Sequence, residues 1–143
     1  MGIEENKKIL QRYIDEVQNR RDLTKLEEIL HEGFYGDNKL GGISGKPAYK
    51  QFGDWITSVF PDIRNEPKEI IAEGDKVVLY STISGTHTGG EFMGQPASGR
   101  RFEIDSIAIY TFKEGKLFSG KVVQDMLSEY QQLGFYPPLP EEK

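Results

Sequence analysis

The side chains best suited to proton transfer in this chain are carboxylates and two histidines. The 143 residues include His31, His87 and 23 Asp or Glu, but no cysteine. Without cysteine, disulfides, thiolate catalysis and cysteine-bound metals are excluded. Two histidines far apart do not predict a histidine-rich metal centre, and no P-loop or dinucleotide motif is present. A carboxylate in apolar surroundings can transfer protons alone, so we expect no cofactor and no metal.

Three residues are candidates for catalysis, each with a structural alternative. Asp125 directly precedes a predicted helix, where its side chain could instead accept the free backbone N–H groups of the first turn. His87 could reach the mouth of a pocket, or hydrogen-bond the glycine-rich segment around it. Asp37 follows two aromatic residues and could belong to a turn. The sequence alone does not choose between these roles.

Apolar spacing of i, i+3 and i+4 predicts helices in the first half of the chain. These helices span about Glu4–Asn19, Leu23–Leu30 and Pro47–Phe60. Phe34–Asn38 is interpreted as a short edge-like segment, and the glycines at 41, 42 and 45 predict a flexible loop.

Alternating apolar and polar residues then predict strands. The strands cover Asn65–Ala72, Lys76–Thr86, Arg101–Lys113 and Lys116–Gln124, and a short helix follows at Met126–Leu133. Helices followed by an antiparallel meander define an α+β fold. A long antiparallel sheet can curl over a helix and leave a conical cavity. We expect one domain over residues 1–136 and a C-terminal tail over 137–143.

The segment between the second and third predicted strands, GTHTGGEFMGQPASG at Gly85–Gly99, holds five glycines and one proline. Such residues predict a shaped hairpin connection. The segment resembles the GTHTGEFMGxPPTGR element of the SnoaL-like polyketide cyclases (ester cyclases), members of the nuclear-transport-factor-2-like superfamily. Further matches in order and spacing are Phe60-Pro61-Asp62, Ala72–Val78, Glu114–Leu117 and Gln132-Leu133-Gly134.

This resemblance implies a cone-shaped fold, a small-molecule pocket and aldol-type ring closure. In the family, a histidine on the penultimate strand and an aspartate on the last strand carry that chemistry. Aligning on the shared motifs places this histidine at Ala108 and this aspartate at Val122. Both positions are apolar here, so family membership alone does not predict an aldol cyclase.

In a hollow cone, aromatic core residues also form the walls of the cavity. Ser106, Tyr110 and Gln124 alternate in phase with Ala108 and Val122, so we expect them on the same, inner face of the sheet. The residues predicted to line a ligand pocket are Tyr13, Phe52, Trp55, Ser106, Ala108, Tyr110, Val122 and Gln124.

Three functions fit these observations. The first is a cyclase, isomerase or hydrolase whose acid or base has moved to Asp37, His87 or Asp125. The second is a non-catalytic module that binds a small hydrophobic metabolite in an apolar cavity. The third is an interaction protein that dimerises through the outer sheet face. An ionisable side chain in the cavity would favour the enzyme, and a wholly apolar lining would favour binding.

The partner expected from the sequence is a small apolar molecule. The net charge is −5 and the basic residues are scattered, which argues against nucleic acid. No apolar run approaches the roughly 20 residues of a membrane span. The acidic N-terminus lacks the apolar core of a signal peptide, so we expect a cytoplasmic protein. Ile107 and Ile109 should face outwards and support a homodimer, with Asp105 on the same face.

Overall fold

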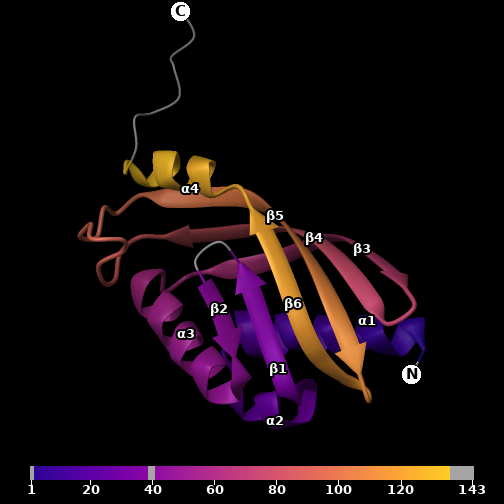
Figure 1. The fold of residues 1–143 in the computed structure, drawn as a ribbon. Coiled ribbons are helices and arrows are strands. Elements are labelled where there is room, and N and C mark those ends of the chain that lie inside the picture. The colour runs from indigo at the N-terminus through magenta and orange to yellow at the C-terminus, as the bar shows by residue number, and fades with distance from the viewer. Residues whose placement is uncertain (1, 39–40, 136–143) are drawn as a thin grey trace, which may run out of the picture.

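Alternation of buried and more exposed residues, clearest in residues 101–113, favours the central strands of this chain. A computed structural model describes residues 2–38 and 41–135 (Figure 1). The strands are β1 (Leu30–Asn38), β2 (Gly41–Ser44), β3 (Arg64–Glu73), β4 (Lys76–Thr86), β5 (Arg101–Lys113) and β6 (Lys116–Gln124). They form one sheet in the order β2-β1-β6-β5-β4-β3. All neighbours are antiparallel except β1 and β6, which pair in parallel.

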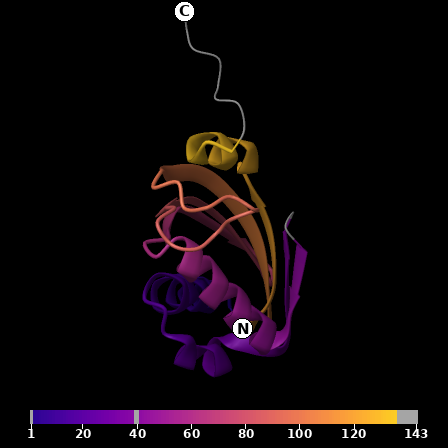
Figure 2. The ribbon, with the colours of Figure 1, turned by 90° about the vertical axis from the view of Figure 1, so that its left-hand side faces the viewer.

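The sheet curves around helices that lie on its concave side (Figure 2). The helical elements are α1 (Ile3–Arg12), the π-helix η1 (Tyr13–Asn19), the 3-10 helix η2 (Leu23–Lys25), α2 (Leu26–Ile29), α3 (Gly45–Val59) and α4 (Met126–Leu133). Figure 1 shows α4 across one end of the sheet. The predicted α+β class is therefore confirmed, with the sheet wrapped around the N-terminal helices.

Two clusters of buried side chains hold these layers together. The larger one joins Leu10 and Ile14 of the first helices to Leu79 and Leu117 of the sheet. The smaller one joins Phe60, Phe92 and Phe102 to Leu133 of α4. The smaller cluster packs two elements against the end of α3: the loop that connects β4 to β5, and helix α4.

The glycine-rich connection between β4 and β5 is shaped by its contact with α3. The N–H groups of Gly89 and Gly90 donate to the oxygens of Val59 and Ser58, at 3.1 and 2.8 Å. A Cβ atom at Gly89 would lie 1.8 Å from the Ser58 oxygen. The loop can therefore satisfy the free carbonyls at the end of α3 only because position 89 has no side chain.

The sequence prediction is wrong for two segments of the sheet. The predicted loop at residues 41–45 contains strand β2, and Phe34–Asn38 is the end of a longer strand that lies inside the sheet, between β2 and β6. The predicted four-stranded meander is present as β3, β4, β5 and β6, and β1 and β2 extend it to a six-stranded mixed sheet. The helix predicted over Glu4–Asn19 changes to π-helix at Tyr13, where the Arg20 N–H donates to the Asp15 oxygen five residues back, at 3.0 Å.

The helix predicted at Leu23–Leu30 is also shorter, because Leu30 already belongs to β1. The predicted tail at 137–143 lies outside the described residues.

Candidate functional site

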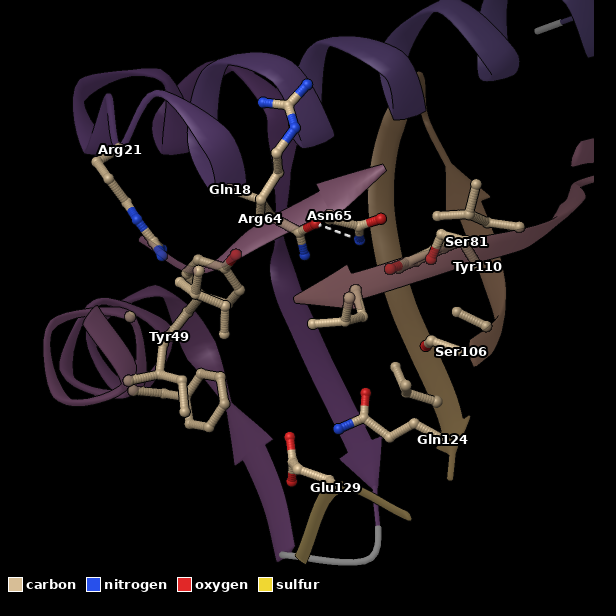
Figure 3. A pocket seen from close by; sticks show the side chains of 18 of the residues that line it. Gln18, Arg21, Tyr49, Arg64, Asn65, Ser81, Ser106, Tyr110, Gln124 and Glu129 are labelled. Atoms are coloured by element: carbon tan, nitrogen blue, oxygen red, sulfur yellow. Dashed lines mark hydrogen bonds between the residues drawn. The ribbon is translucent and has the colours of Figure 1, made fainter. Parts of the chain in front are cut away.

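A cavity of about 170 Å³ lies between the concave face of the sheet and the helices. Side chains from η1, α3, β3, β4, β5, β6 and α4 line it, and Figure 3 shows most of them. Elements far apart in the sequence therefore meet at one hollow, as expected of a binding site in a mainly apolar pocket.

The floor of the cavity consists of two rows that cross β4, β5 and β6. Ser81 pairs with Ser106, and Ser106 pairs with Gln124, which gives a polar row. In the neighbouring row, Leu79 pairs with Ala108, and Ala108 pairs with Val122. Residues two apart in a strand share a face, so both rows point into the cavity. The two positions at which the resemblance places the family's histidine and aspartate lie side by side in the apolar row.

Glu129 of α4 provides a carboxyl group at this cavity. It is 5% exposed and is the only Asp or Glu among the described residues that line the cavity. Its burial raises the pKa from 4.5 to about 7, because the charged form is poorly solvated. Figure 3 shows its carboxyl group and the Gln124 amide pointing into the same end of the cavity. The site thus contains a carboxyl group that changes charge near neutral pH.

A polar network borders another part of the cavity, and its residues Gln18, Tyr49 and Asn65 belong to the lining. The side-chain amide of Asn65 donates to the Gln18 side-chain oxygen at 2.8 Å, and the Tyr13 hydroxyl donates to the Tyr49 hydroxyl at 2.9 Å. Burial raises the pKa of both tyrosines, so they remain neutral at physiological pH. The Oδ1 atom of Asn65 is buried and has no hydrogen-bond partner within the described chain. It is an acceptor available to a ligand.

Six of the eight predicted pocket residues line this cavity: Phe52, Ser106, Ala108, Tyr110, Val122 and Gln124. Tyr13 lies behind the wall, where its hydroxyl meets that of Tyr49. Trp55 of α3 is 41% exposed and is not part of the described cavity lining. The centroid of its ring lies 6.0 Å from that of Phe52 and 5.8 Å from that of Phe92.

His87 lies in the loop after β4, fully buried and apart from the described cavity lining. The Ser98 N–H donates to Nδ1 at 3.3 Å, so the ring proton is on Nε2, which donates to the Gly90 oxygen at 2.8 Å. Both ring nitrogens are therefore engaged by the backbone of the glycine-rich loop. This arrangement corresponds to the structural alternative for His87.

Asp125 and Asp37 are both exposed, unlike the buried Glu129. Asp125 is exposed, and its carboxylate accepts the Ser128 N–H at 3.1 Å, which makes it the N-cap of α4. Asp37 is exposed on β1, opposite Gly42 and Lys121. The structure brings neither of them to the described cavity lining.

The sequence analysis missed Glu129, although a signal for it was present. Leu133, four residues further along the same helix, is fully apolar and buried. Residues four apart share one face of a helix, so Glu129 had to point the same way as Leu133. The Asp125 cap fixes where this helix begins and hence this phase.

The outer face of the sheet carries Ile107, Ile109 and Val123, which are 52%, 43% and 59% exposed. Asp105 lies on the same face and accepts the Tyr80 hydroxyl at 3.1 Å. The strand alternation predicted for these residues is confirmed, and the homodimer remains a prediction. None of the described helices has the length and apolar character needed to cross a membrane. No group of three or more His, Asp or Glu side chains in the described ranges is arranged to hold a metal ion.

Comparison with known proteins identifies the family of this cavity-bearing cone. The sequence profile of SnoaL-like polyketide cyclases matches residues 8–133. The chain is 26% identical over 121 residues to nogalonic acid methyl ester cyclase from Streptomyces nogalater, covering 82% of this chain and 88% of that protein. It is 30% identical over 100 residues to an aklanonic acid methyl ester cyclase from Streptomyces peucetius, covering 69% and 68% of the two chains.

The fold comparison agrees. The structure of TsrD from Streptomyces laurentii superposes with a TM-score of 0.81 at 25% identity, covering 95% of this chain and 99% of that one. The chain belongs to the SnoaL-like polyketide cyclase family, and its fold is the nuclear-transport-factor-2-like cone.

Proposed function

We propose that this protein carries out cofactor-independent acid/base chemistry, of the cyclase or isomerase type, on a small apolar carbonyl compound. The observation that supports this proposal is the buried carboxyl of Glu129 at the cavity, with a pKa of about 7. A proton-transfer group works best when its pKa lies near the working pH. Glu129 meets this condition through burial alone.

In the proposed reaction, the ionised Glu129 carboxylate removes a proton from the carbon next to the substrate carbonyl. The C–H electron pair moves into the new C–C double bond, and negative charge develops on the carbonyl oxygen. The Gln124 amide and the Ser106 hydroxyl, which line the same cavity, are donors suited to that charge. The protonated Glu129 then returns its proton, either to another atom of the enolate or to the alkoxide formed on ring closure.

In this proposal, Glu129 takes over the proton transfer that a histidine and an aspartate on the last two strands carry out in the family. Ala108 and Val122 cannot transfer protons, and they instead give the substrate an apolar surface next to the polar row of Ser106 and Gln124. The acid/base group would then come from α4, so the same cavity would keep its chemistry with a proton-transfer group on a different element.

Exchange of α-protons tests this function without knowledge of the natural substrate. 2-Tetralone in D₂O is the probe, and NMR follows loss of its α-proton signal above the buffer rate. Wild-type protein should accelerate exchange, and Glu129→Gln should lose at least about 100-fold of this acceleration, the lower range for a general base. Asp125→Asn is the matched control, because Asn also serves as an N-cap, and it should exchange at the wild-type rate. Equal rates for wild type and Glu129→Gln would reject the proposed role of Glu129.

The second candidate function is binding of a small hydrophobic metabolite without turnover. The apolar pair Ala108 and Val122 supports it, because the cavity keeps its walls without the family's catalytic side chains. In that case the probe would bind to the cavity, and wild-type protein would leave α-proton exchange at the buffer rate.

A further inference from the structure

Arg21 borders the same cavity at a distance from the α4 end. It follows the π-helix η1, and its side chain is half-buried at the cavity lining. Figure 3 shows its guanidinium beside Tyr49, whereas Glu129 approaches from α4 at another end. The cavity therefore has a cation at one end and a carboxyl at the other.

Arg21 differs from Arg12, which is bound by carboxylates. Arg12 forms ion pairs with Glu16 and Glu28 at 2.8 and 2.9 Å. No ion pair or side-chain hydrogen bond engages Arg21 within residues 2–38 and 41–135. A positive charge that is partly removed from water without a partner is unfavourable. A bound anion would offset this cost.

The backbone at Arg21 adds a second observation. Its φ angle is +62°, in the left-handed region that non-glycine residues rarely adopt. Such conformations cost free energy and gather at ligand sites, where surrounding structure maintains them. The unusual turn directs this side chain to the cavity directly after the π-helix, an element that is itself frequent at functional sites.

The Asn65 oxygen supplies the third observation. It is a buried acceptor on the lining without a partner in the described chain, while the amide nitrogen of the same side chain is held by Gln18. An unpaired buried acceptor is costly, and a ligand hydroxyl would satisfy it. Arg64 also borders the cavity, but its side chain is exposed, and Figure 3 shows its guanidinium turned away from Gln124 and Glu129. Among the described residues of the lining, one cation thus remains for the ligand, which fits a monoanion.

We propose that the ligand of this cavity carries a free carboxylate that binds Arg21, on an apolar body that lies along Leu79, Ala108 and Val122. A hydroxyl group on the ligand donates to the Asn65 oxygen. This inference rests on the proposed function, since it names the substrate class of the same cavity. The substrate is then an aromatic or alicyclic keto acid whose carboxylate lies apart from the reacting carbon.

Matched acids and methyl esters test the proposal by calorimetry. The probes are 3-phenylpropanoic, 4-phenylbutanoic and 5-phenylpentanoic acid with their methyl esters, near pH 6, where the acids are ionised. The wild type should bind at least one acid about tenfold or more tightly than its ester, as expected for a charge-assisted hydrogen bond. Arg21→Gln should lose this preference and keep the affinity for the ester. Arg20→Gln, which removes an exposed neighbouring charge, should bind like wild type.

Arg21→Gly is the second variant, because glycine suits the left-handed backbone and keeps the turn. It should behave like Arg21→Gln. Equal affinity of wild type for acids and esters, or a preference that survives in both variants, would overturn the proposal, as would no binding of any probe at millimolar concentration. An intact acid preference without α-proton exchange of 2-tetralone would instead reject the proposed function and leave the carboxylate site standing.

Discussion

Burial of Glu129 should make the stability of this protein depend on pH, and Glu129→Gln should remove that dependence. The carboxyl has a pKa of about 7 in the folded protein and an ordinary value of 4.5 when solvated. Between these values the folded state holds a proton that the unfolded state has released. The stabilisation is therefore fully present below about pH 4.5 and is lost as the pH rises through about 7.

The size of the effect follows from the two pKa values. Each pKa unit corresponds to about 1.4 kcal/mol, so ionisation of Glu129 should cost the folded state about 3 kcal/mol in total. The side chain is almost fully buried, so solvent screening reduces this value little. The difference in unfolding free energy between wild type and Glu129→Gln should change by about this amount between about pH 4 and pH 9.

Urea unfolding of both proteins across this pH range measures the difference directly. Glu91→Gln, which removes an exposed carboxylate in the loop after β4, is the control and should follow wild type. A difference between wild type and Glu129→Gln that stays constant within about 1 kcal/mol would refute the argument from burial.

Two further pairs of substitutions test how the site is built. Gly89→Ala should destabilise the protein by about 1–3 kcal/mol, because its Cβ would lie 1.8 Å from the Ser58 oxygen. Gly90→Ala should cost less than about 1 kcal/mol, because its Cβ would lie 3.9 Å from the same oxygen. Similar urea midpoints of the two variants would contradict this. Asp125→Ala should lose about 1 kcal/mol and a few degrees in melting temperature, while Asp125→Asn retains most of the stability, because Asp125 caps α4. Equal melting temperatures of Asp125→Ala and wild type would exclude the cap as a source of stability.

The sequence predicts the central sheet well because its signals are local. The boundaries of β4, β5, β6 and α4 match the predicted ones. Buried and exposed residues alternate along most of β5, and turns such as Glu114-Gly115, where both residues have positive φ, end the strands at defined positions. Asp125 begins α4 by capping it.

The parts that the sequence does not predict depend on distant partners. β1 is a strand because it pairs in parallel with β6, more than 80 residues later in the chain, where Gly36 lies opposite Gly120. β2 consists of residues whose glycines favour a loop, and it forms because β1 offers it an edge. Local composition contains neither pairing.

The candidate site likewise contains residues that local sequence signals predict and residues that depend on how distant elements pack. Strand alternation predicts that Ser106 and Gln124 share a face with Ala108 and Val122, and all four line the cavity. Glu129 required the phase of α4 relative to the sheet, and Arg21 required a left-handed turn after a π-helix. The spacing of Glu129 to Leu133 indicates its direction, whereas the direction of Arg21 follows from how separate elements pack.

Burial of Glu129 links stability to activity in this account. The stabilisation is lost between about pH 4.5 and 7, so the fold no longer has it at the pH at which the carboxylate forms and can remove a proton. A catalytic group would in this way be maintained at the expense of the folded state, as at other strained or desolvated sites.

The pH–rate profile of 2-tetralone exchange by the wild-type protein tests the central claim most directly. If Glu129 is the base, the acceleration over the buffer rate should rise with a midpoint near pH 7 and level off above it. An acceleration that already reaches its plateau near pH 5, as for a solvated carboxylate, or no acceleration at any pH, would contradict the account.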